Sequence, residues 1–470
     1  MKIVLMHYHL KPGGVTTVLK QQATAISKSG EVLVITGEPP DSSFAFDTAY
    51  IPGLGYDGEG RDKIDRPRQV ARAVEDAIFS KWKTGCDVLH VHNPILKKNR
   101  NFLKILKLLQ IQGQNLFLQI HDFAEDGRPR AYFNDEYPAN CHYGVINRRD
   151  EEILLRAGLK KKGLHRIFNT IHFFDLEDQS PQEEPLILYP IRAIRRKNIG
   201  EALLLSLFFK DREALHITLP PNSPADIKPY RKWKDFVKRT ALKVLFDAGL
   251  SADFPNLVRL AKFMITTSIT EGFGFCFLEP WTAHKLLWGR KLPDICRDFE
   301  TNGIRLDHLY ENLWVPLAWL GKENVYEKWV TAIMTSSRLI GLHPGKETIS
   351  NAFEQVTKGQ MIDFGLLDET FQEKIVTRIL CQKKDKQTLI RLNPYLAHPG
   401  MISNQKPVIE KNHQAITKAY NPQMYQEKLT KIYARVATEP VHHCIDKQVV
   451  LNCFFDLRSF SLLKWGPNAV

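Results

Sequence analysis

The chain has 470 residues, of which 43% are hydrophobic and 25% are charged, close to the average of globular proteins. This composition excludes a disordered or collagen-like chain, and the length suffices for two domains with separate cores. No apolar run reaches the roughly 18–20 residues that a membrane-spanning helix needs, and the first residues turn polar too early for a signal peptide. Seven scattered cysteines indicate a reducing cytoplasm rather than a disulfide framework.

The charge balance favours an anionic ligand. Lys and Arg number 65 against 52 Asp and Glu, a formal net charge of +13. The basic residues are spread along the chain, and no zinc finger, basic zipper or RNA-binding aromatic pattern accompanies them, so we do not expect nucleic acid as the partner. The histidines and cysteines near the end of the chain match no metal-binding spacing, and we expect no bound metal. A phosphate-bearing small molecule is the expected ligand.

Short apolar segments alternate with amphipathic ones in the first part of the chain. The pattern predicts helices at 15–27, 67–82 and 102–110, and strands at 2–6, 32–35, 87–92 and 115–120. Such alternation is typical of a parallel sheet in an α/β domain.

The same pattern starts again after a polar, proline-bounded stretch at 175–185, which we interpret as a linker. Helices are predicted at 199–208 and 275–285, and strands at 186–190, 215–219 and 263–268. We therefore expect an N-terminal domain at 1–178, a second Rossmann-like domain at 186–415 and a C-terminal segment at 416–470. Residues 291–411 form an unassigned insertion in the second domain.

Polar residues follow the predicted strands, where ligands bind in open parallel sheets. Five sets do so: His9 with Gly13-Gly14, His92-Asn93, His121-Asp122, Arg192 to Lys197, and Glu271 to Gly274. Two such domains facing each other would bring all five sets to one cleft.

Two of these sets suit an anion. Gly13 and Gly14 precede a helix, where backbone N–H groups can bind a negative charge; the alternative is an ordinary tight turn. Four cations gather in the second set (Arg192, Arg195, Arg196 and Lys197). Two of them could neutralise a diphosphate leaving group, and the alternative is a solvated basic turn.

The set at Glu271 is the most informative. Glu271 stands in a glycine-rich turn with Gly272 and Gly274, and Glu279 follows within the predicted helix. A spacing of about two helical turns lets both carboxylates face one side. The open N–H groups suit a phosphate, whereas the alternative is a capped helix with one buried acid.

These residues resemble the retaining GT-B glycosyltransferases of the group 1, family 4 type. The family's E-x7-E motif is matched by Glu271 and Glu279, its Gly-Gly turn by Gly13-Gly14, and its Arg and Lys after the first strand of the second domain by Arg192 and Lys197. His121 matches a family histidine, and 421–433 resembles a late helix that crosses back onto the first domain. The resemblance covers about 1–290 and this helix.

The resemblance implies an α/β protein of two Rossmann-like domains facing across a cleft. It implies a retaining transferase that moves a sugar from a nucleotide-activated donor to an unidentified hydroxyl acceptor, with neither cofactor nor metal. The acceptor would be a small molecule, a glycan or a lipid-linked molecule. The implied catalytic residues are His121, Glu271, Arg192 and Lys197. The implied donor-binding residues are Gly13, Gly14, Arg192, Lys197, Glu271, Gly272, Phe273, Gly274 and Glu279. On the acceptor side, in the first domain, we place His9, His92, Asn93 and Asp122.

Two departures from the family pattern concern the donor. The basic turn has Ile191-Arg192-Ala193 where the family has a glycine before the arginine. The segment 283–290 also departs from the family's Gly-x-Pro-Val loop, which shapes the nucleotide pocket, so the base is not assigned.

Rival interpretations remain open at this point. His121 with Asp122 could form the acid–base pair of a nucleotide-sugar epimerase or hydrolase, and the cleft could belong to a non-catalytic protein that binds an anion or nucleic acid. The basic residues before 102 extend the helical pattern at 102–110 back to residue 97, and a basic amphipathic helix over 97–109 could rest on an anionic membrane. We favour its packing on the sheet through Phe102, Ile105, Leu106 and Leu109.

Overall fold

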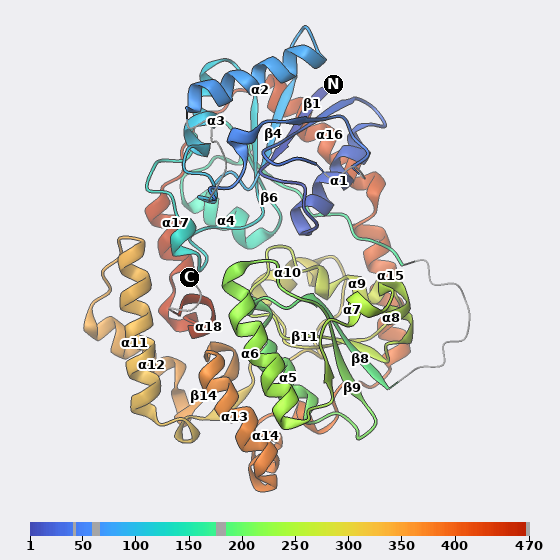
Figure 1. Ribbon diagram of the computed structural model, residues 1–470, viewed down its shortest axis with the longest axis vertical. Helices are drawn as coiled ribbons and strands as arrows, with labels where there is room; N and C mark the ends of the chain where they lie inside the picture. Colours follow the sequence, from blue (N-terminus) through green and yellow to red (C-terminus); the bar gives the residue numbers. More distant parts are fainter. Residues whose placement is uncertain (41–43, 59–65, 175–184, 467–470) are drawn as a thin grey trace. The chain divides into compact units, whose positions relative to one another are not determined.

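The computed structural model describes residues 1–40, 44–58, 66–174 and 185–466 (Figure 1). The chain forms two compact units. Unit 1 contains Met1–Thr170 and Tyr420–Phe455, and unit 2 contains Ile171–Ala419 and the chain from Asp456 onward. These limits differ from the predicted 1–178, 186–415 and 416–470 chiefly at the end of the chain, where the last residues return to unit 2. The predicted linker lies, except for Pro185, outside the described residues.

Unit 1 is built on a parallel sheet whose strands have the order β3-β2-β1-β4-β5-β6-β7. Its strands are β1 (Lys2–His7), β2 (Glu31–Thr36), β3 (Thr48–Tyr50), β4 (Val88–His92), β5 (Leu116–Ile120), β6 (His142–Val145) and β7 (Leu164–Arg166). Its helices are α1 (Gly14–Ile26), α2 (Pro67–Lys81), α3 (Phe102–Ile111), α4 (Arg148–Arg156), α16 (Pro422–Thr438) and α17 (Lys447–Phe454).

Alternating side chains of the strands in unit 1 build two cores. Val4 and Met6 of β1 pack with α2 and α3 on one face, and Ile3 and Leu5 pack with α1 and α16 on the other. Helix α16, which comes from the last part of the chain, completes this core, and Figure 1 shows it beside α1. Asn421 caps α16 by accepting a hydrogen bond from the Met424 N–H, and Pro422 occupies the first turn, where no N–H is needed.

Unit 2 contains a second parallel sheet, with strand order β10-β9-β8-β11-β12. Its strands are β8 (Leu186–Arg192), β9 (Ala214–Leu219), β10 (Val244–Leu245), β11 (Phe263–Thr266) and β12 (Leu287–Gly289). The two orders, with neighbours added outward from a central first strand, are those of Rossmann-like sheets. The predicted α/β class with parallel sheets is confirmed.

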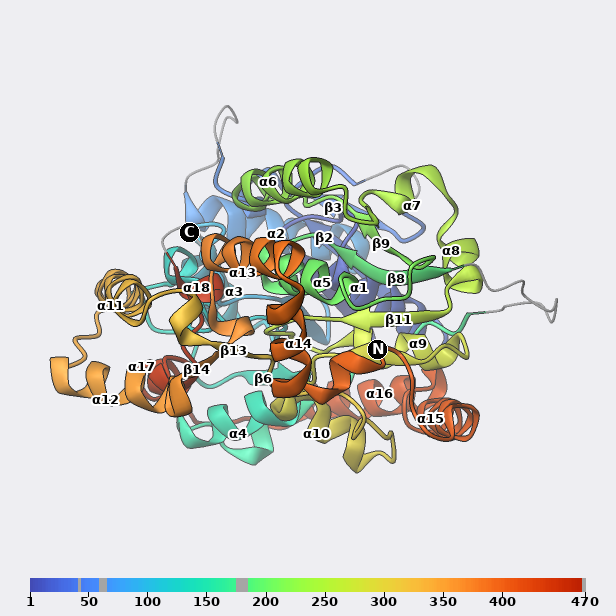
Figure 2. The same cartoon turned by 90° about the horizontal axis from the view of Figure 1, so that it is seen from below.

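Helices surround the sheet of unit 2, and α5 and α13 lie side by side (Figures 1 and 2). The helices are α5 (Ile199–Ser206), α6 (Pro224–Thr240), α7 (Ala248–Ser251), α8 (Phe254–Leu260), α9 (Glu279–Thr282), α10 (Pro293–Thr301), α11 (Lys322–Leu339), α12 (Lys346–Val356), α13 (Glu369–Cys381), α14 (Lys383–Leu392), α15 (Gln405–Ala419) and α18 (Leu462–Trp465). Residues 291–411, unassigned from sequence, contribute α10 to α14, the start of α15 and an antiparallel pair, β13 (Trp314–Pro316) with β14 (Met361–Asp363).

The helix predicted at 275–285 is wrong in its extent. A single 3-10 turn, η5 (Phe275–Phe277), is followed by the short α9. Pro280 lacks an N–H and so cannot continue a helix begun at Phe275, but it fits the first turn of a new one. Glu279 therefore opens α9 rather than lying inside a longer helix.

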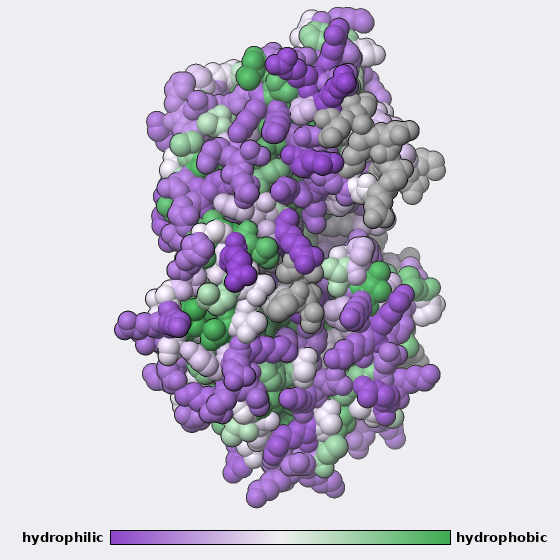
Figure 3. Space-filling view, turned by 60° about the vertical axis from the view of Figure 1, so that its left-hand side comes forward, coloured by the Kyte–Doolittle hydropathy of each residue, from purple (hydrophilic) through white to green (hydrophobic). Residues whose placement is uncertain are grey.

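The amphipathic stretch near 97–109 is a core helix. It begins at Phe102 rather than at residue 97, and Phe102, Ile105, Leu106 and Leu109 are all fully buried, which agrees with the packed alternative. Within the described ranges, no helix is both long and apolar enough to cross a bilayer. On the face drawn in Figure 3, hydrophilic residues predominate and hydrophobic ones form scattered small patches.

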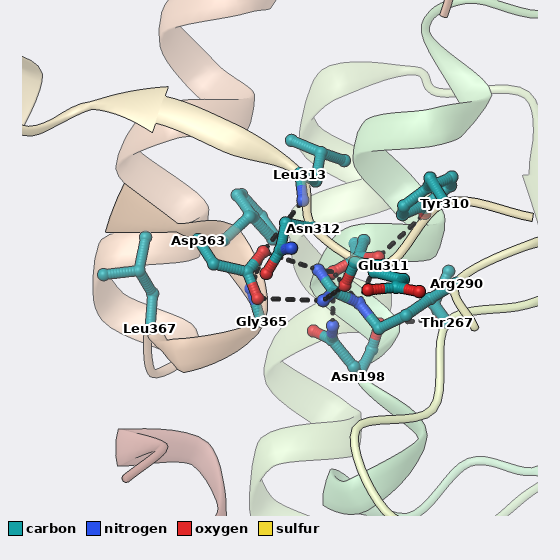
Figure 4. A network of polar contacts seen from close by, with 12 residues as sticks. Asn198, Thr267, Arg290, Tyr310, Glu311, Asn312, Leu313, Asp363, Gly365 and Leu367 are labelled. Carbon is teal, nitrogen blue, oxygen red and sulfur yellow. Dashed lines mark hydrogen bonds and ion pairs between the residues drawn. The ribbon is translucent and has the colours of Figure 1, made fainter. Parts of the chain in front are cut away.

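A buried charge network joins the sheet of unit 2 to the unassigned segment (Figure 4). Arg290, just after β12, donates hydrogen bonds of 2.7–3.2 Å to Glu201 of α5 and of 2.8 Å to both oxygens of Asp363. The Tyr310 hydroxyl donates to Glu201 at 2.8 Å. Burial raises the pKa of Glu201, and Arg290 opposes that rise. In the part of the chain that the structure describes, Glu201 and Asp363 form ion pairs with Arg290 alone, so removing Arg290 leaves two buried carboxylates without a counter-ion.

We predict that Arg290→Met lowers the free energy of unfolding of unit 2 by about 3–5 kcal/mol, because two buried carboxylates lose their counter-ion. Lys322→Met is the control, since Lys322 forms an exposed pair with Glu354 at 2.8 Å and should cost at most about 1 kcal/mol. Calorimetric melting of both variants measures the difference. Equal losses in the two variants would contradict this account.

Candidate functional site

The basic turn of unit 2 follows β8 at the carboxyl edge of the sheet. A 3-10 turn, η4 (Arg195–Lys197), leads to Asn198, whose φ of 54° is left-handed, a conformation that asparagine tolerates better than most residues. The buried Asn198 side chain is fixed by a hydrogen bond to Glu201 at 2.7 Å and one from Gln372 at 2.8 Å. The turn is therefore held by the core beneath it.

Lys197 is fixed through its backbone. Its carbonyl accepts hydrogen bonds from the Tyr189 hydroxyl at 2.7 Å and from Thr267 Oγ1 at 2.9 Å. Thr267 lies just after β11, so these bonds tie the loop after β8 to the loop after β11. Tyr189 and Thr267 are not among the site residues predicted from sequence. Each is a polar side chain within an otherwise apolar predicted strand, and that was the available signal.

Lys197 and Glu271 form an ion pair in which Nζ donates to Oε1. Glu271 is 7% exposed. Burial raises the pKa of Glu271, but the charges of Lys197 and Arg196 lower it by more, so its pKa lies below the ordinary value. The carboxylate is therefore ionised at neutral pH and can accept hydrogen bonds from a ligand.

Glu279 lies near the same lysine and behaves differently. Burial raises its pKa to about 7, while the charge of Lys197 opposes the rise. In the part of the chain that the structure describes, its carboxylate has neither a hydrogen-bond partner nor an ion-pair partner. Hydroxyl donors of a ligand would supply the partners that the protein does not.

The glycine-rich turn between the two acids is shaped by packing. Gly274 has a φ of 92°, and a Cβ there would lie 2.9 Å from the Phe277 ring, so no larger residue fits. Phe273 packs edge-on against Phe275 and Phe299, and its ring belongs to this aromatic cluster. Gly272 is half-buried beside Glu271. Any contact of Phe273 with a donor would use its backbone.

The two flanking arginines of the basic turn differ in role. Arg192 is half-exposed, and its Nη1 donates to the Pro220 carbonyl at 3.0 Å. Arg195 is buried and makes a two-pronged ion pair with Glu369 at 2.5 and 2.8 Å, so it anchors α13. The cluster of four cations thus divides into a structural member, Arg195, and three that stay nearer the surface.

In unit 1, His9 and the two glycines follow β1. Nδ1 of His9 accepts from the Lys11 N–H at 3.3 Å, which places the proton on Nε2, and Nε2 donates to the Tyr56 hydroxyl at 3.2 Å. A Cβ at Gly14 would meet nothing within 4 Å, so packing does not require a glycine there. Tyr56 was another residue that sequence reasoning missed, because it lies in a short loop.

Two histidines of β4 and one just after β5 form a buried stack. His92 lies between His90 and His121, with ring centroids 4.4 and 5.2 Å away, and its Nδ1 is 2.9 Å from His121 Nε2. His92 is fully buried, so it can orient His121 but cannot itself contact an acceptor. Burial lowers the pKa of His121 to about 4, which leaves it uncharged at neutral pH.

Asn93 and Asp122 shape the loop after β5. The side chain of Asn93, buried and with a left-handed φ of 51°, accepts from the N–H groups of His121 and Asp122 at 2.8 and 3.1 Å. Asn93 therefore positions this loop. The Asp122 carboxylate accepts from Arg128 at 2.8 Å. Because His121 faces His92 and Asp122 faces Arg128, the two are not bonded to each other as an acid–base pair.

Among the described residues, no group of three or more His, Cys, Asp or Glu side chains is arranged to hold a metal ion. Glu271 pairs with the ammonium group of Lys197.

Comparisons with known proteins agree with this architecture. No protein-family model matches the chain. The mannosylglucosyl-3-phosphoglycerate synthase of Petrotoga mobilis is 26% identical over 418 residues, which cover 79% of this chain and 80% of that enzyme.

Solved structures share the fold. A glycosyltransferase from Rickettsia africae matches with a TM-score of 0.55 at 12% identity, over 93% of this chain and 99% of its own. Anabaena HepE in complex with UDP-glucose matches with a TM-score of 0.55 at 13% identity, over 92% of this chain and 98% of its own. The predicted GT-B fold is confirmed, and the predicted enzyme class, a glycosyltransferase, is supported.

We predict that Glu279→Gln raises the melting temperature by about 2 °C or more at pH 8. The raised pKa means that ionising Glu279 opposes folding, so stability falls as pH rises from the unfolded pKa towards 7. The gain from Gln should therefore shrink towards pH 5.5. Calorimetry of wild type and variant across this range measures it. A gain that does not change with pH would show that Glu279 does not titrate in this way.

Proposed function

We propose that the protein is a retaining glycosyltransferase in which unit 2 binds a nucleotide-activated sugar and unit 1 binds the acceptor. One observation carries the proposal: Lys197 lies beside two carboxylates of opposite character, Glu271 held ionised and Glu279 without a partner. A buried ion pair is weak evidence for stability. A ligand with both hydroxyl groups and anionic oxygens suits this arrangement.

The donor fits the groups at the carboxyl edge of the unit 2 sheet. Arg192 and Lys197 face the diphosphate, Glu271 accepts hydrogen bonds from hydroxyls of the sugar, and Glu279 accepts from the ribose. The UDP-glucose complex of Anabaena HepE, a protein of the same fold, supports a nucleotide sugar as the donor class. The departures at 283–290 leave the base to experiment.

Transfer requires charge to be stabilised on the leaving group. As the bond between the anomeric carbon and the diphosphate oxygen breaks, negative charge grows on that oxygen, and cations placed there in advance lower the barrier. The acceptor hydroxyl attacks from the face that the diphosphate leaves, and its proton passes to the departing phosphate oxygen. This route retains the anomeric configuration and uses side-chain cations, so we propose that no metal is required.

The acceptor class follows from the Petrotoga relative, whose name describes a product containing phosphoglycerate. We extend this to the present chain and propose an acceptor that presents a hydroxyl group together with a phosphate or carboxylate. The net charge of +13 favours such an anion. All seven cysteines are free thiols, as a protein acting in a reducing cytoplasm would have.

We predict that Glu271→Ala lowers kcat about 100-fold or more while changing the dissociation constant of the donor less than about threefold. The reason is that contacts to the transferred sugar strengthen as the bond breaks. Glu354→Ala, at an exposed position, is the control. Initial rates and calorimetric titration with UDP-, GDP- and ADP-sugars measure both quantities. An unchanged kcat in Glu271→Ala would refute the assignment.

A further inference from the structure

A group of charged and aromatic side chains in unit 1 lies beyond the residues that the sequence singled out. It consists of Tyr56, Lys98 and Arg128, which come from the loops after β3, β4 and β5, next to His9 and Asp122. We refer to Tyr56, Lys98 and Arg128 as the unit 1 cation cluster. The sequence analysis placed Lys98 on a helix, but that helix begins at Phe102, which leaves Lys98 in the preceding loop.

Lys98 is the member without a counter-ion. Its side chain is half-buried, and Nζ lies 5.7 Å from the centroid of the Tyr56 ring. Within the described chain, no carboxylate forms an ion pair with it and no acceptor takes a hydrogen bond from its ammonium group. Burial and the charge of Arg128 lower the pKa of Lys98, and Asp122 offsets this only in part. A partly desolvated ammonium group without an anion is costly to keep.

The neighbouring charges do not neutralise Lys98. Asp122 pairs with Arg128 at 2.8 Å, and the buried Glu38 pairs with Lys11 at 2.6 Å. Asp57 accepts a hydrogen bond from the backbone N–H of Arg100 at 2.8 Å, and its Oδ2 lies 4.0 Å from Nε of the Arg100 side chain. Each nearby carboxylate thus has its own basic partner, and with His9 held neutral by burial the group keeps an excess positive charge.

The backbone around Lys98 is fixed. The Asn99 side chain donates to the carbonyls of Gly53 and Gly55 at 2.8 and 2.9 Å. The Asp57 N–H donates to the Lys98 carbonyl at 2.7 Å. These bonds join the loop carrying Lys98 to the loop carrying Tyr56, so the ammonium group and the phenol are held together before any ligand arrives. A preorganised site loses less free energy on binding than a flexible one.

We propose that the unit 1 cation cluster is a subsite for the phosphate or carboxylate group of the acceptor, with Lys98 as its principal charge. The Lys98 ammonium group would form an ion pair with the anionic group of the ligand. Arg128, whose guanidinium is oriented by its hydrogen bond to Asp122, adds a second cation. The His9 Nε2–H and the Tyr56 hydroxyl, hydrogen-bonded to each other, lie beside it as further polar groups. This subsite deepens the proposed function, and its assignment to the acceptor rests on that function.

The test uses the full chain with inorganic phosphate and with glycerate, a carboxylate without phosphate, as probes. We expect Lys98→Met, which keeps the aliphatic stem, to weaken binding of the preferred probe about tenfold or more, since a charged hydrogen bond contributes about 1.5–3 kcal/mol. Lys97→Met is the matched control, because Lys97 is exposed one residue earlier, and it should change binding less than about twofold. Lys98→Arg should recover part of the loss. Circular dichroism checks that each variant is folded.

The probes and a parallel measurement separate the outcomes. Lys98-dependent binding of phosphate identifies a phosphate subsite, and Lys98-dependent binding of glycerate alone identifies a carboxylate subsite; both support the proposal. Equal affinities of Lys98→Met and Lys97→Met, or no binding of either anion to wild type, would overturn it. Titration with nucleotide sugars in the same variants should be unaffected. If the wild type binds no nucleotide sugar but still binds an anion through Lys98, the proposed function is rejected and the anion subsite is not.

Discussion

The ion pair between Lys197 and Glu271 is the interaction on which this account depends. Its lysine is fixed through the backbone by Tyr189 and Thr267, and its carboxylate is kept ionised although it is 7% exposed. The core beneath, with Asn198, Glu201 and Arg290 bonded in series, holds the turn in place. Burying the charges of Lys197 and Glu271 at the end of a strand costs free energy of desolvation. A ligand that forms hydrogen bonds with the same two side chains would offset part of that cost.

The fold could largely be predicted from sequence, because buried parallel strands are continuous apolar runs and their helices show regular apolar spacing. Segments such as β1, β4 and α5 were therefore placed within about two residues, a normal boundary error. The segment 291–411 could not be placed, since its arrangement depends on contacts such as Arg290 with Asp363, which join residues distant in the chain.

The site was predictable in part. Sequence indicates which residues follow a strand, but not which of them point to the surface. From sequence, His92 and His121 take equivalent places near the ends of two strands, yet only the structure shows that His92 is fully buried within the histidine stack. Lys98 was overlooked because an amphipathic pattern extended the helix backwards, and its importance comes from missing partners, which sequence does not reveal. Glu279 was found, but Pro280 changes its setting from a helix interior to a helix start.

The central claim is that the chain transfers a sugar from a nucleotide donor with retention. Incubation with nucleotide sugars and phosphorylated or carboxylated hydroxyl acceptors, followed by proton NMR of the anomeric signal, tests it most directly. The account predicts a new glycoside whose anomeric configuration equals that of the donor. A glycoside of inverted configuration, or release of free sugar alone, would contradict it.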